Sequence, residues 1–262
     1  MHCPGDPGEE SSLEGERRPW LAYLETLRKN LIVVGATWFV AFVTLYGFVE
    51  ELFNRLAEPM RRALPAGSSM VFVEATEPFF TYLTLAAVAA LVVSLPVILG
   101  QAWALMTTGR SRKHKGLGFF FILGGCLAFV AGGYLGFAYV FPVIFAFLIH
   151  FGTDAGTVAA MLSMGDYLSL ALKMMLAFGL VFELPVVMTV LARLGLADRT
   201  WFAAKRKYML ILAFVFGALV TPGPDVVSQC SIAIPFVLLY EVGILGAWLC
   251  GNPDAGREGT KS

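Results

Sequence analysis

Apolar residues fall into long blocks along this chain, and the blocks set the expected fold. Leu31 to Val49 and Tyr82 to Met106 are two examples. A helix needs about 20 apolar residues to cross the roughly 30 Å hydrocarbon core of a bilayer. We therefore expect an all-α integral membrane protein with six transmembrane helices, at about residues 31–49, 79–106, 117–141, 167–190, 208–221 and 227–248.

The fifth expected helix, at 208–221, is shorter than the others. About 14 residues give about 21 Å of helix, against about 30 Å of hydrocarbon. Either the boundary lies a few residues further out, or the helix is buried among others, or the bilayer thins around it. Thinning would suit a protein that moves cargo across a membrane.

Basic residues are distributed unevenly between the two ends of these helices. Lys and Arg near span ends are retained in the cytoplasm. One side carries 15 of the 19 basic residues, the other carries Arg55, Arg61 and Arg62, and Lys173 falls within the fourth span. Both termini should therefore be cytoplasmic, in a multi-pass protein of the cytoplasmic (inner) membrane. The larger set is Arg17, Arg18, Arg28, Lys29, Arg110, Arg112, Lys113, Lys115, Arg193, Arg199, Lys205, Arg206, Lys207, Arg257 and Lys261.

The first external loop begins with an amphipathic segment. Between Glu50 and Leu64, apolar residues recur at helical spacing among charges, which predicts a helix that lies flat on the membrane surface as an external cap. Pro59 should bend it. The chain as a whole divides into a polar cytoplasmic N-terminal segment, a membrane domain and a disordered cytoplasmic tail, at 1–22, 23–250 and 251–262.

Composition supports a membrane protein and argues against an enzyme. Hydrophobic residues make up 58% of the chain and charged residues only 15%, where a soluble domain has about 25% charged residues. The net charge is zero, so nothing suggests nucleic acid binding. The four cysteines show no metal-ligand spacing, and catalytic signatures such as a Walker loop or H-E-x-x-H are absent from the sequence. We expect no cofactor.

Small residues recur every four positions in the third span. The series is Gly124, Ala128, Gly132 and Gly136, and such a ridge allows another helix to approach closely. The ridge could serve packing within the chain or contacts between copies in a homo-oligomer.

Polar residues inside the expected spans are the candidate functional groups. Glu183 lies deep in span four, where an ionisable side chain is costly unless it faces a partner or a water-filled cavity. Pro185 should open the local hydrogen-bond ladder. A protonated glutamic acid bonded to a neighbouring backbone group is the structural alternative for Glu183. Gln229 and Glu241 are also embedded, and Glu241 could meet the basic loop after span four.

Both halves of the chain carry a series of short motifs. Those of the amino half are Pro59, Pro78-Phe79-Phe80, Pro96 and Gln101-x-Trp103. Those of the carboxyl half are Tyr167, Phe178-Gly179, Phe182-Glu183-Leu184-Pro185-Val186, Arg206, Tyr208, Thr221-Pro222-Gly223-Pro224-Asp225-Val226-Val227-Ser228-Gln229, Ala233-Ile234-Pro235 and Leu239-Tyr240-Glu241. This series resembles the TatC family, the multi-spanning receptor of the twin-arginine protein translocase. Gly223 departs from the family's adjacent prolines.

The resemblance implies a curved wall of six helices that recognises signal peptides bearing paired arginines. Such a protein also serves as a scaffold for small single-span partners of the TatA and TatB type, and the translocase exports folded proteins by means of the proton-motive force. The matching positions assign signal-peptide binding to Glu25, Thr26, Leu27, Arg28 and His114, and partner-helix contact to Glu183, Thr221 and Gln229.

Two departures concern the acidic residues that would pair with the twin arginines. TatC proteins usually open with His-Leu-x-Glu-Leu-Arg, and here Thr26 stands at the glutamate position, with Glu25 one residue early. That shift rotates the carboxylate by about 100° on a helix. His114 takes the place of the second family glutamate, in the basic loop Gly109 to Lys115, which should repel a guanidinium pair. The alternative is a different alignment of this short loop, in which Glu25 would still pair with the twin arginines.

These departures leave two interpretations within the family and one outside it. The chain could be a working translocase receptor with altered signal reading, or a divergent paralogue that assembles with small partners without binding twin-arginine signals. A secondary transporter would show repeated, broken helices around a midplane site, and the sequence shows no such repeat.

The topology can be tested by labelling single cysteines in intact cells. Positions 17, 112, 205 and 257 should react only from the cytoplasm, and positions 62, 154 and 223 should react with an impermeant reagent from outside. External labelling at position 112 would contradict the six-span arrangement.

Overall fold

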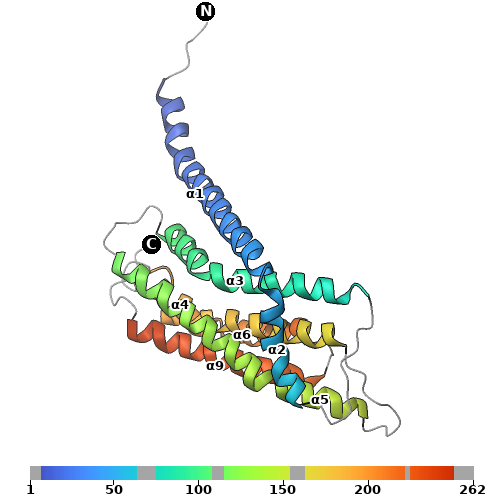
Figure 1. Cartoon of the computed structure of the whole chain (residues 1–262). Coiled ribbons are helices and arrows are strands. Elements are labelled where there is room, and N and C mark those ends of the chain that lie inside the picture. The colour runs from blue at the N-terminus through green and yellow to red at the C-terminus, as the bar shows by residue number, and fades with distance from the viewer. Residues whose placement is uncertain (1–6, 64–74, 108–114, 154–162, 222–224, 251–262) are drawn as a thin grey trace, which may run out of the picture.

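The structure of this protein is a computed structural model that describes residues 7–63, 75–107, 115–153, 163–221 and 225–250, and its elements are helices (Figure 1). The N-terminal part of α1 extends beyond the other helices. In chain order the elements are α1 (Pro7–Tyr46), α2 (Val49–Ala63), α3 (Glu77–Met106), α4 (Lys115–Leu135), the π-helical turn η2 (Gly136–Val140), α5 (Phe141–Thr153), α6 (Met164–Arg193), α7 (Arg199–Ala204), α8 (Arg206–Val220) and α9 (Val226–Cys250).

Five helical stretches among the described residues are long and apolar enough to cross a membrane. They match five of the six spans expected from the sequence. The exception is α8, whose 15 residues reach only about 22 Å, so a sixth crossing stays a prediction. The five stretches are Leu24–Tyr46, Glu77–Met106, Leu117–Phe147, Gly165–Arg193 and Val226–Cys250.

The helix α1 begins well before the first apolar block. It has 40 residues from Pro7, so the polar segment expected at 1–22 is helical from residue 7 onward. Residues 9–18 contain four glutamates and two arginines, and these straight-chain side chains have high helix propensity. The sequence pattern therefore located the membrane-crossing part of α1 but not its full length.

One stripe of α1 faces α3. The partly buried positions 26, 30, 34, 37, 38, 41, 42 and 45 recur at helical spacing. Two hydrogen bonds fix the register: Asn30 Nδ2 donates to the Gln101 carbonyl over 3.1 Å, and Trp38 Nε1 donates to the Ala87 carbonyl over 3.2 Å. Polar side chains in lipid gain from such partners on a neighbouring helix.

The helix α2 matches the amphipathic segment expected at 50–64 and continues through Pro59 to Ala63. Its apolar face is buried, at Val49, Phe53 and Ala57, against side chains of α3 and α6. The contacts explain the apolar spacing by packing against protein. Whether α2 also lies on the outer membrane surface stays a prediction. The buried partners are Leu85, Ala86, Val88, Leu168 and Leu172.

The helices α4 and α6 lie side by side, and part of the expected small-residue ridge forms this contact. A Cβ atom at Gly132 would lie 2.6 Å from the Phe178 carbonyl oxygen, so only glycine allows this approach. Gly136 likewise faces the Phe178 side chain, whereas the Cβ position of Gly124 is open. Packing within the chain thus accounts for two of the four positions.

A polar cluster fixes α7 and α8 to the second half of α9. The predicted contact between Glu241 and the basic loop is confirmed, since Arg206 Nη2 lies 2.7 Å from Glu241 Oε2. Nearby, the Tyr240 hydroxyl donates to the Phe202 carbonyl over 2.8 Å. Asp198 caps α7, and hydrogen bonds from the Thr200 hydroxyl and the Trp201 amide hold the pKa of this carboxyl below its ordinary value.

Candidate functional site

The stretch assigned to signal-peptide binding lies on α1. Glu25, Leu27 and Arg28 are exposed, whereas Thr26 is partly buried on the stripe that faces α3. The neighbouring residues on the helix therefore point in different directions, as the 100° rotation per residue requires. A carboxylate at position 25 is not equivalent to one at position 26.

The contact between Asn30 and Gln101 places this stretch beside the C-terminal end of α3. Thr26 lies one turn before Asn30 on the same stripe, and α3 ends at Met106, five residues after Gln101. The loop that begins after Thr107 contains His114, which lies outside the described residues. The structure therefore locates the α1 part of the predicted site, while signal-peptide binding by these residues stays a prediction.

Glu183 occupies a buried position between α6 and its neighbours α3 and α4. Glu183 is only 7% exposed, and its carboxylate lies beside Gly125, which also borders the Leu99 side chain. A Cβ atom on Gly125 would lie 2.9 Å from Glu183 Oε2, so a larger residue there would require the Glu183 and Leu99 side chains to move.

Neither carboxylate oxygen of Glu183 has a hydrogen-bond partner within the described part of the chain. The hydrogen bond to a backbone group that the structural alternative required is thus not formed there. Burying an ionised carboxyl group without a partner costs several kcal/mol, so this environment favours the neutral acid or a polar partner from outside the described residues. Pro185, two residues further along α6, has no N–H and cannot be that donor.

Thr221 and Gln229 both contact Gly217 of α8, near the junction of α8 and α9. Thr221 Oγ1 donates to the Gly217 carbonyl over 3.0 Å, and the Gln229 backbone packs against Gly217. Asp225 begins α9 by accepting a 2.7 Å hydrogen bond from the Ser228 amide. Glu183, by contrast, borders Gly125 of α4. Thr221 and Gln229 thus share a neighbour on α8, whereas Glu183 has a neighbour on α4.

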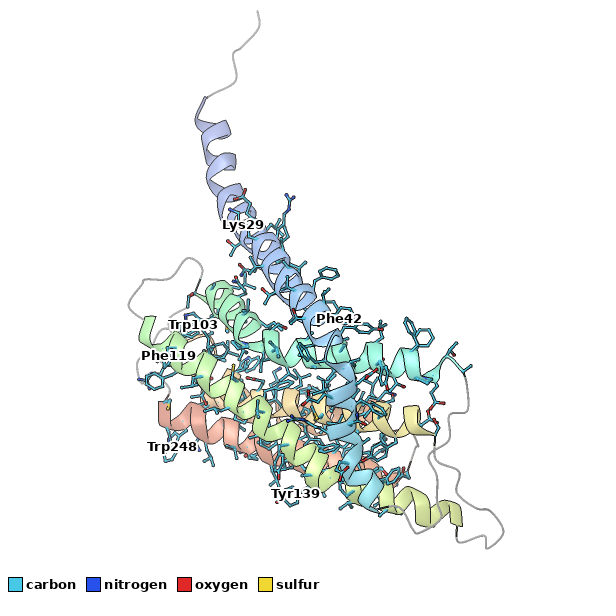
Figure 2. The ribbon with its side chains drawn as sticks, in the orientation of Figure 1. Lys29, Phe42, Trp103, Phe119, Tyr139 and Trp248 are labelled. Atoms are coloured by element: carbon cyan, nitrogen blue, oxygen red, sulfur yellow. The ribbon has the colours of Figure 1, made fainter. Side chains whose placement is uncertain are left out.

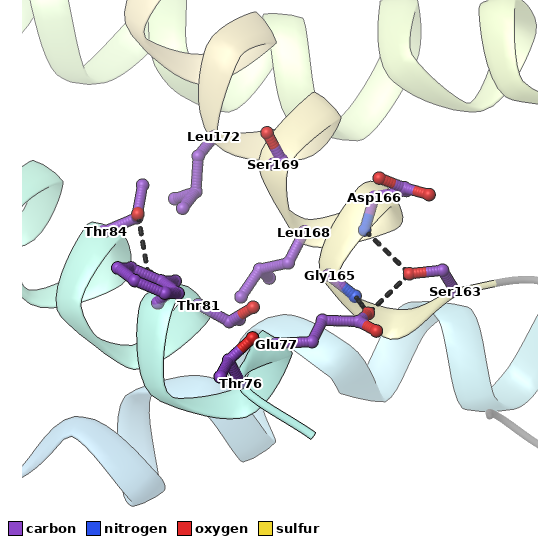
Figure 3. Close-up of a pocket in the computed structure, with 11 residues that line it drawn as sticks. Thr76, Glu77, Thr81, Thr84, Ser163, Gly165, Asp166, Leu168, Ser169 and Leu172 are labelled. Atoms are coloured by element: carbon purple, nitrogen blue, oxygen red, sulfur yellow. Dashed lines mark hydrogen bonds between the residues drawn. The ribbon is translucent and has the colours of Figure 1, made fainter. Parts of the chain in front are cut away.

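A second polar site was not predicted from the sequence. Figure 3 shows Glu77, at the start of α3, reaching the start of α6, where Oε1 accepts hydrogen bonds from Ser163 Oγ and, over 2.6 Å, from the Gly165 amide. Ser163 Oγ in turn accepts from the Asp166 amide as the cap of α6. The pattern Ser163-x-x-Asp166 is a recognisable helix-start signal, but no local signal pairs it with Glu77.

This junction borders a cavity of about 440 Å³ between α3 and α6. Its polar wall consists largely of hydroxyl groups, including those of Thr81, Thr84 and Ser169 (Figure 3). No group of three or more His, Cys, Asp or Glu side chains that could hold a metal ion occurs among the residues the structure describes. The chemistry of the described sites is that of polar contacts between helices.

The fold and these sites define a multi-pass helical membrane protein in which polar groups inside and at the ends of the spans hold helices together. The chain belongs to the TatC family: the family model for the Sec-independent protein translocase protein (TatC) matches residues 22–235. It is thus a component of the twin-arginine, Sec-independent protein translocase.

Individual relatives agree with this assignment over nearly the whole chain. The TatC protein of Desulforapulum autotrophicum is 39% identical over 241 residues, covering 92% of this chain and 88% of the relative. That of Escherichia coli K12 is 33% identical over 229 residues, covering 87% and 88%. A crystal structure of the twin-arginine translocase receptor TatC superposes with a TM-score of 0.78 at 31% identity, covering 87% of this chain and 99% of that one.

The Glu77 junction should contribute measurably to stability. Glu77→Ala removes the carboxylate that accepts from Ser163 and Gly165, and hydrogen bonds to charged groups are worth roughly 1.5–3 kcal/mol each. We expect the unfolding temperature of the purified protein to fall by several degrees, as followed by tryptophan fluorescence. Glu51→Ala is the matched control, because its ion pair with Arg55 is exposed and should contribute little. Equal unfolding temperatures for both variants would contradict the role of Glu77.

Proposed function

We propose that this chain is the signal-peptide receptor of the translocase, and that it binds the peptide at the start of the membrane-crossing part of α1. The observation that carries the proposal is the placement of the stretch from Glu25 to Arg28. Most of its side chains are exposed, and the hydrogen bond from Asn30 to Gln101 fixes it beside the end of α3. An exposed stretch on a fixed helix can present the same side chains to each incoming peptide.

The charges around this site should determine its affinity for paired arginines. Position 26 faces α3, where a glutamate would lie in the angle between two helices, and here it holds a threonine. Glu25 is exposed on a neighbouring face. The following loop carries Arg110, Arg112 and Lys113, and like charges across a contact disfavour association. We therefore propose that this chain binds a twin-arginine signal peptide more weakly than a TatC protein that has both family glutamates.

Similarity over most of the chain to named translocase components favours the working receptor over the divergent paralogue. Both termini would be cytoplasmic, in the inner membrane, as the distribution of basic residues predicts. The energy would come from the proton-motive force, as for the family.

We also propose that the chain is a scaffold for single-span partners of the TatA and TatB type, with contacts at two places. At the first, Glu183 supplies a carboxyl group that has no hydrogen-bond donor within the described ranges of the chain. A polar side chain on a partner helix could satisfy it once α4 moves aside, because the carboxyl is covered in the isolated chain. At the second, Thr221 and Gln229 offer polar groups at the α8–α9 junction.

Removal of the Glu183 carboxyl should weaken partner binding without removing the protein from the membrane. Glu183→Ala deletes the acceptor that a partner would use. We expect lower yields of crosslinks to single-span partners at unchanged membrane abundance, with Glu241→Ala, which loses a different contact, as the control. Loss of the protein from the membrane in Glu183→Ala would show that Glu183 serves only the packing of α6.

Restoring acidic residues should strengthen recognition of twin arginines. Each missing carboxylate removes a charge-assisted contact worth roughly 1.5–3 kcal/mol, or about one to two powers of ten in affinity. Thr26→Glu together with His114→Glu should raise binding of an Arg-Arg signal peptide, but not of a Lys-Gln peptide, in crosslinking to the purified protein. Leu27→Glu with His114→Glu adds equal charge on another face and should gain less.

Strong, arginine-dependent binding by the unmodified chain would contradict this account of the site. It would show that Glu25, or an acid elsewhere, already pairs with the arginines.

A further inference from the structure

A largely apolar groove opens between α4 and α9. Both helices pack along α6, which forms the floor of the groove, and the volume is about 610 Å³. Phe120 of α4, Val186 and Val190 of α6, and Val242 of α9 are among the lining residues. Gly246 brings α9 close to α6, because a Cβ atom there would collide with the Thr189 hydroxyl.

Arg193 is the cation among the described residues that line this groove. Arg193 belongs to the last turn of α6, is exposed, and forms no ion pair with any residue that the structure describes. The Thr189 hydroxyl already donates to the Pro185 carbonyl over 2.7 Å. The guanidinium is therefore the charged group of the groove that is open to an anionic ligand.

The position of Arg193 along the bundle corresponds to a membrane interface. The start of α4 and the ends of α6 and α9 lie at the same end of the molecule (Figure 1). Trp103, Phe119 and Trp248 are grouped toward this end (Figure 2), as aromatic residues are at the boundary between lipid and water. The sequence before α4 adds Arg110, Arg112 and Lys113, which marks this end as cytoplasmic.

We propose that the groove binds one anionic phospholipid of the cytoplasmic leaflet. An acyl chain would lie along Val186, Val190 and Val242, and the phosphate would pair with Arg193. Basic pockets between spans on the cytoplasmic side bind anionic head groups in this way. The residues proposed for peptide and partner contact do not line the groove, although α4 and α6 carry both the groove and the surroundings of Glu183.

Size favours a lipid chain over a partner helix. A transmembrane helix is a cylinder about 10 Å wide and about 30 Å long, or roughly 2,400 Å³, several times the volume of the groove. Arg193 at the rim also matches a head group better than it matches an apolar helix, which would leave its charge without a partner. A slender apolar tail with an anionic end fits both features.

Native mass spectrometry of the full-length protein can measure this binding. The probes are phosphatidylglycerol and phosphatidylcholine with identical acyl chains. We expect phosphatidylglycerol to bind about fivefold more tightly, and Arg193→Gln to remove that difference. Arg193→Lys should keep most of the preference. Lys207→Gln, a loss of charge at the same end but outside the groove lining, should leave binding unchanged.

A second pair of variants tests the acyl chain. Val242→Trp should fill the groove and weaken both lipids, whereas Leu245→Trp, an exposed position of α9 outside the lining, should not. Glycerol phosphate, which lacks acyl chains, should not displace the lipid. Equal affinity for the two lipids, or phosphatidylglycerol binding that Arg193→Gln and Val242→Trp both leave unchanged, would overturn the proposal.

A photoreactive amino acid at position 242 tests the proposal in native membranes without the Val242→Trp substitution. Illumination should yield an adduct with the mass of a phospholipid. An adduct with another protein would assign the groove to a partner helix instead. That result, or the absence of a lipid adduct, would overturn the proposal.

Discussion

Close packing against α6 is the constraint on which the rest of the structure depends. Helices α3, α4, α8 and α9 all contact it. In lipid, apolar surfaces gain little by leaving their surroundings, so helices associate through close van der Waals contact and scattered polar bonds. Glycines supply that closeness on both sides of α6: Gly132 of α4 lies against the Phe178 backbone, and Gly243 of α9 lies against Met188.

Polar contacts fix the helices mainly near their ends. Glu77 joins the starts of α3 and α6, while at the opposite end Arg206 pairs with Glu241 and Tyr240 bonds to the Phe202 carbonyl. Charged and polar groups cost least there, because water and head groups remain within reach. Between these ends the packing is mostly apolar, and the hydrogen bond from Trp38 to the Ala87 carbonyl is a polar contact between α1 and α3 in this region.

Glu183 is the exception to this arrangement. It places a carboxyl group inside the wall, with Gly125 as the space that admits it and no donor among the described residues to satisfy it. Such a group makes the isolated chain less stable than an apolar side chain of similar size would. Under the proposal that a single-span partner helix docks here, a polar group of that helix would supply the hydrogen-bond donor that Glu183 lacks among the described residues.

The sequence by itself determined the membrane class, five of the helical spans and the motifs of the family, because hydrocarbon thickness and the exclusion of charge act on local composition. It also predicted the pairing of Glu241 with the basic loop, since both were expected at the same ends of neighbouring spans. Only the tertiary structure joined Glu77 to Ser163, 86 residues away, and placed Glu183 beside Gly125 of α4. Which face of one helix packs against which face of another depends on the fit between side chains that are far apart in the sequence. A block that is hydrophobic on every face has no polar side to indicate its packing direction, so the sequence pattern does not predict these contacts.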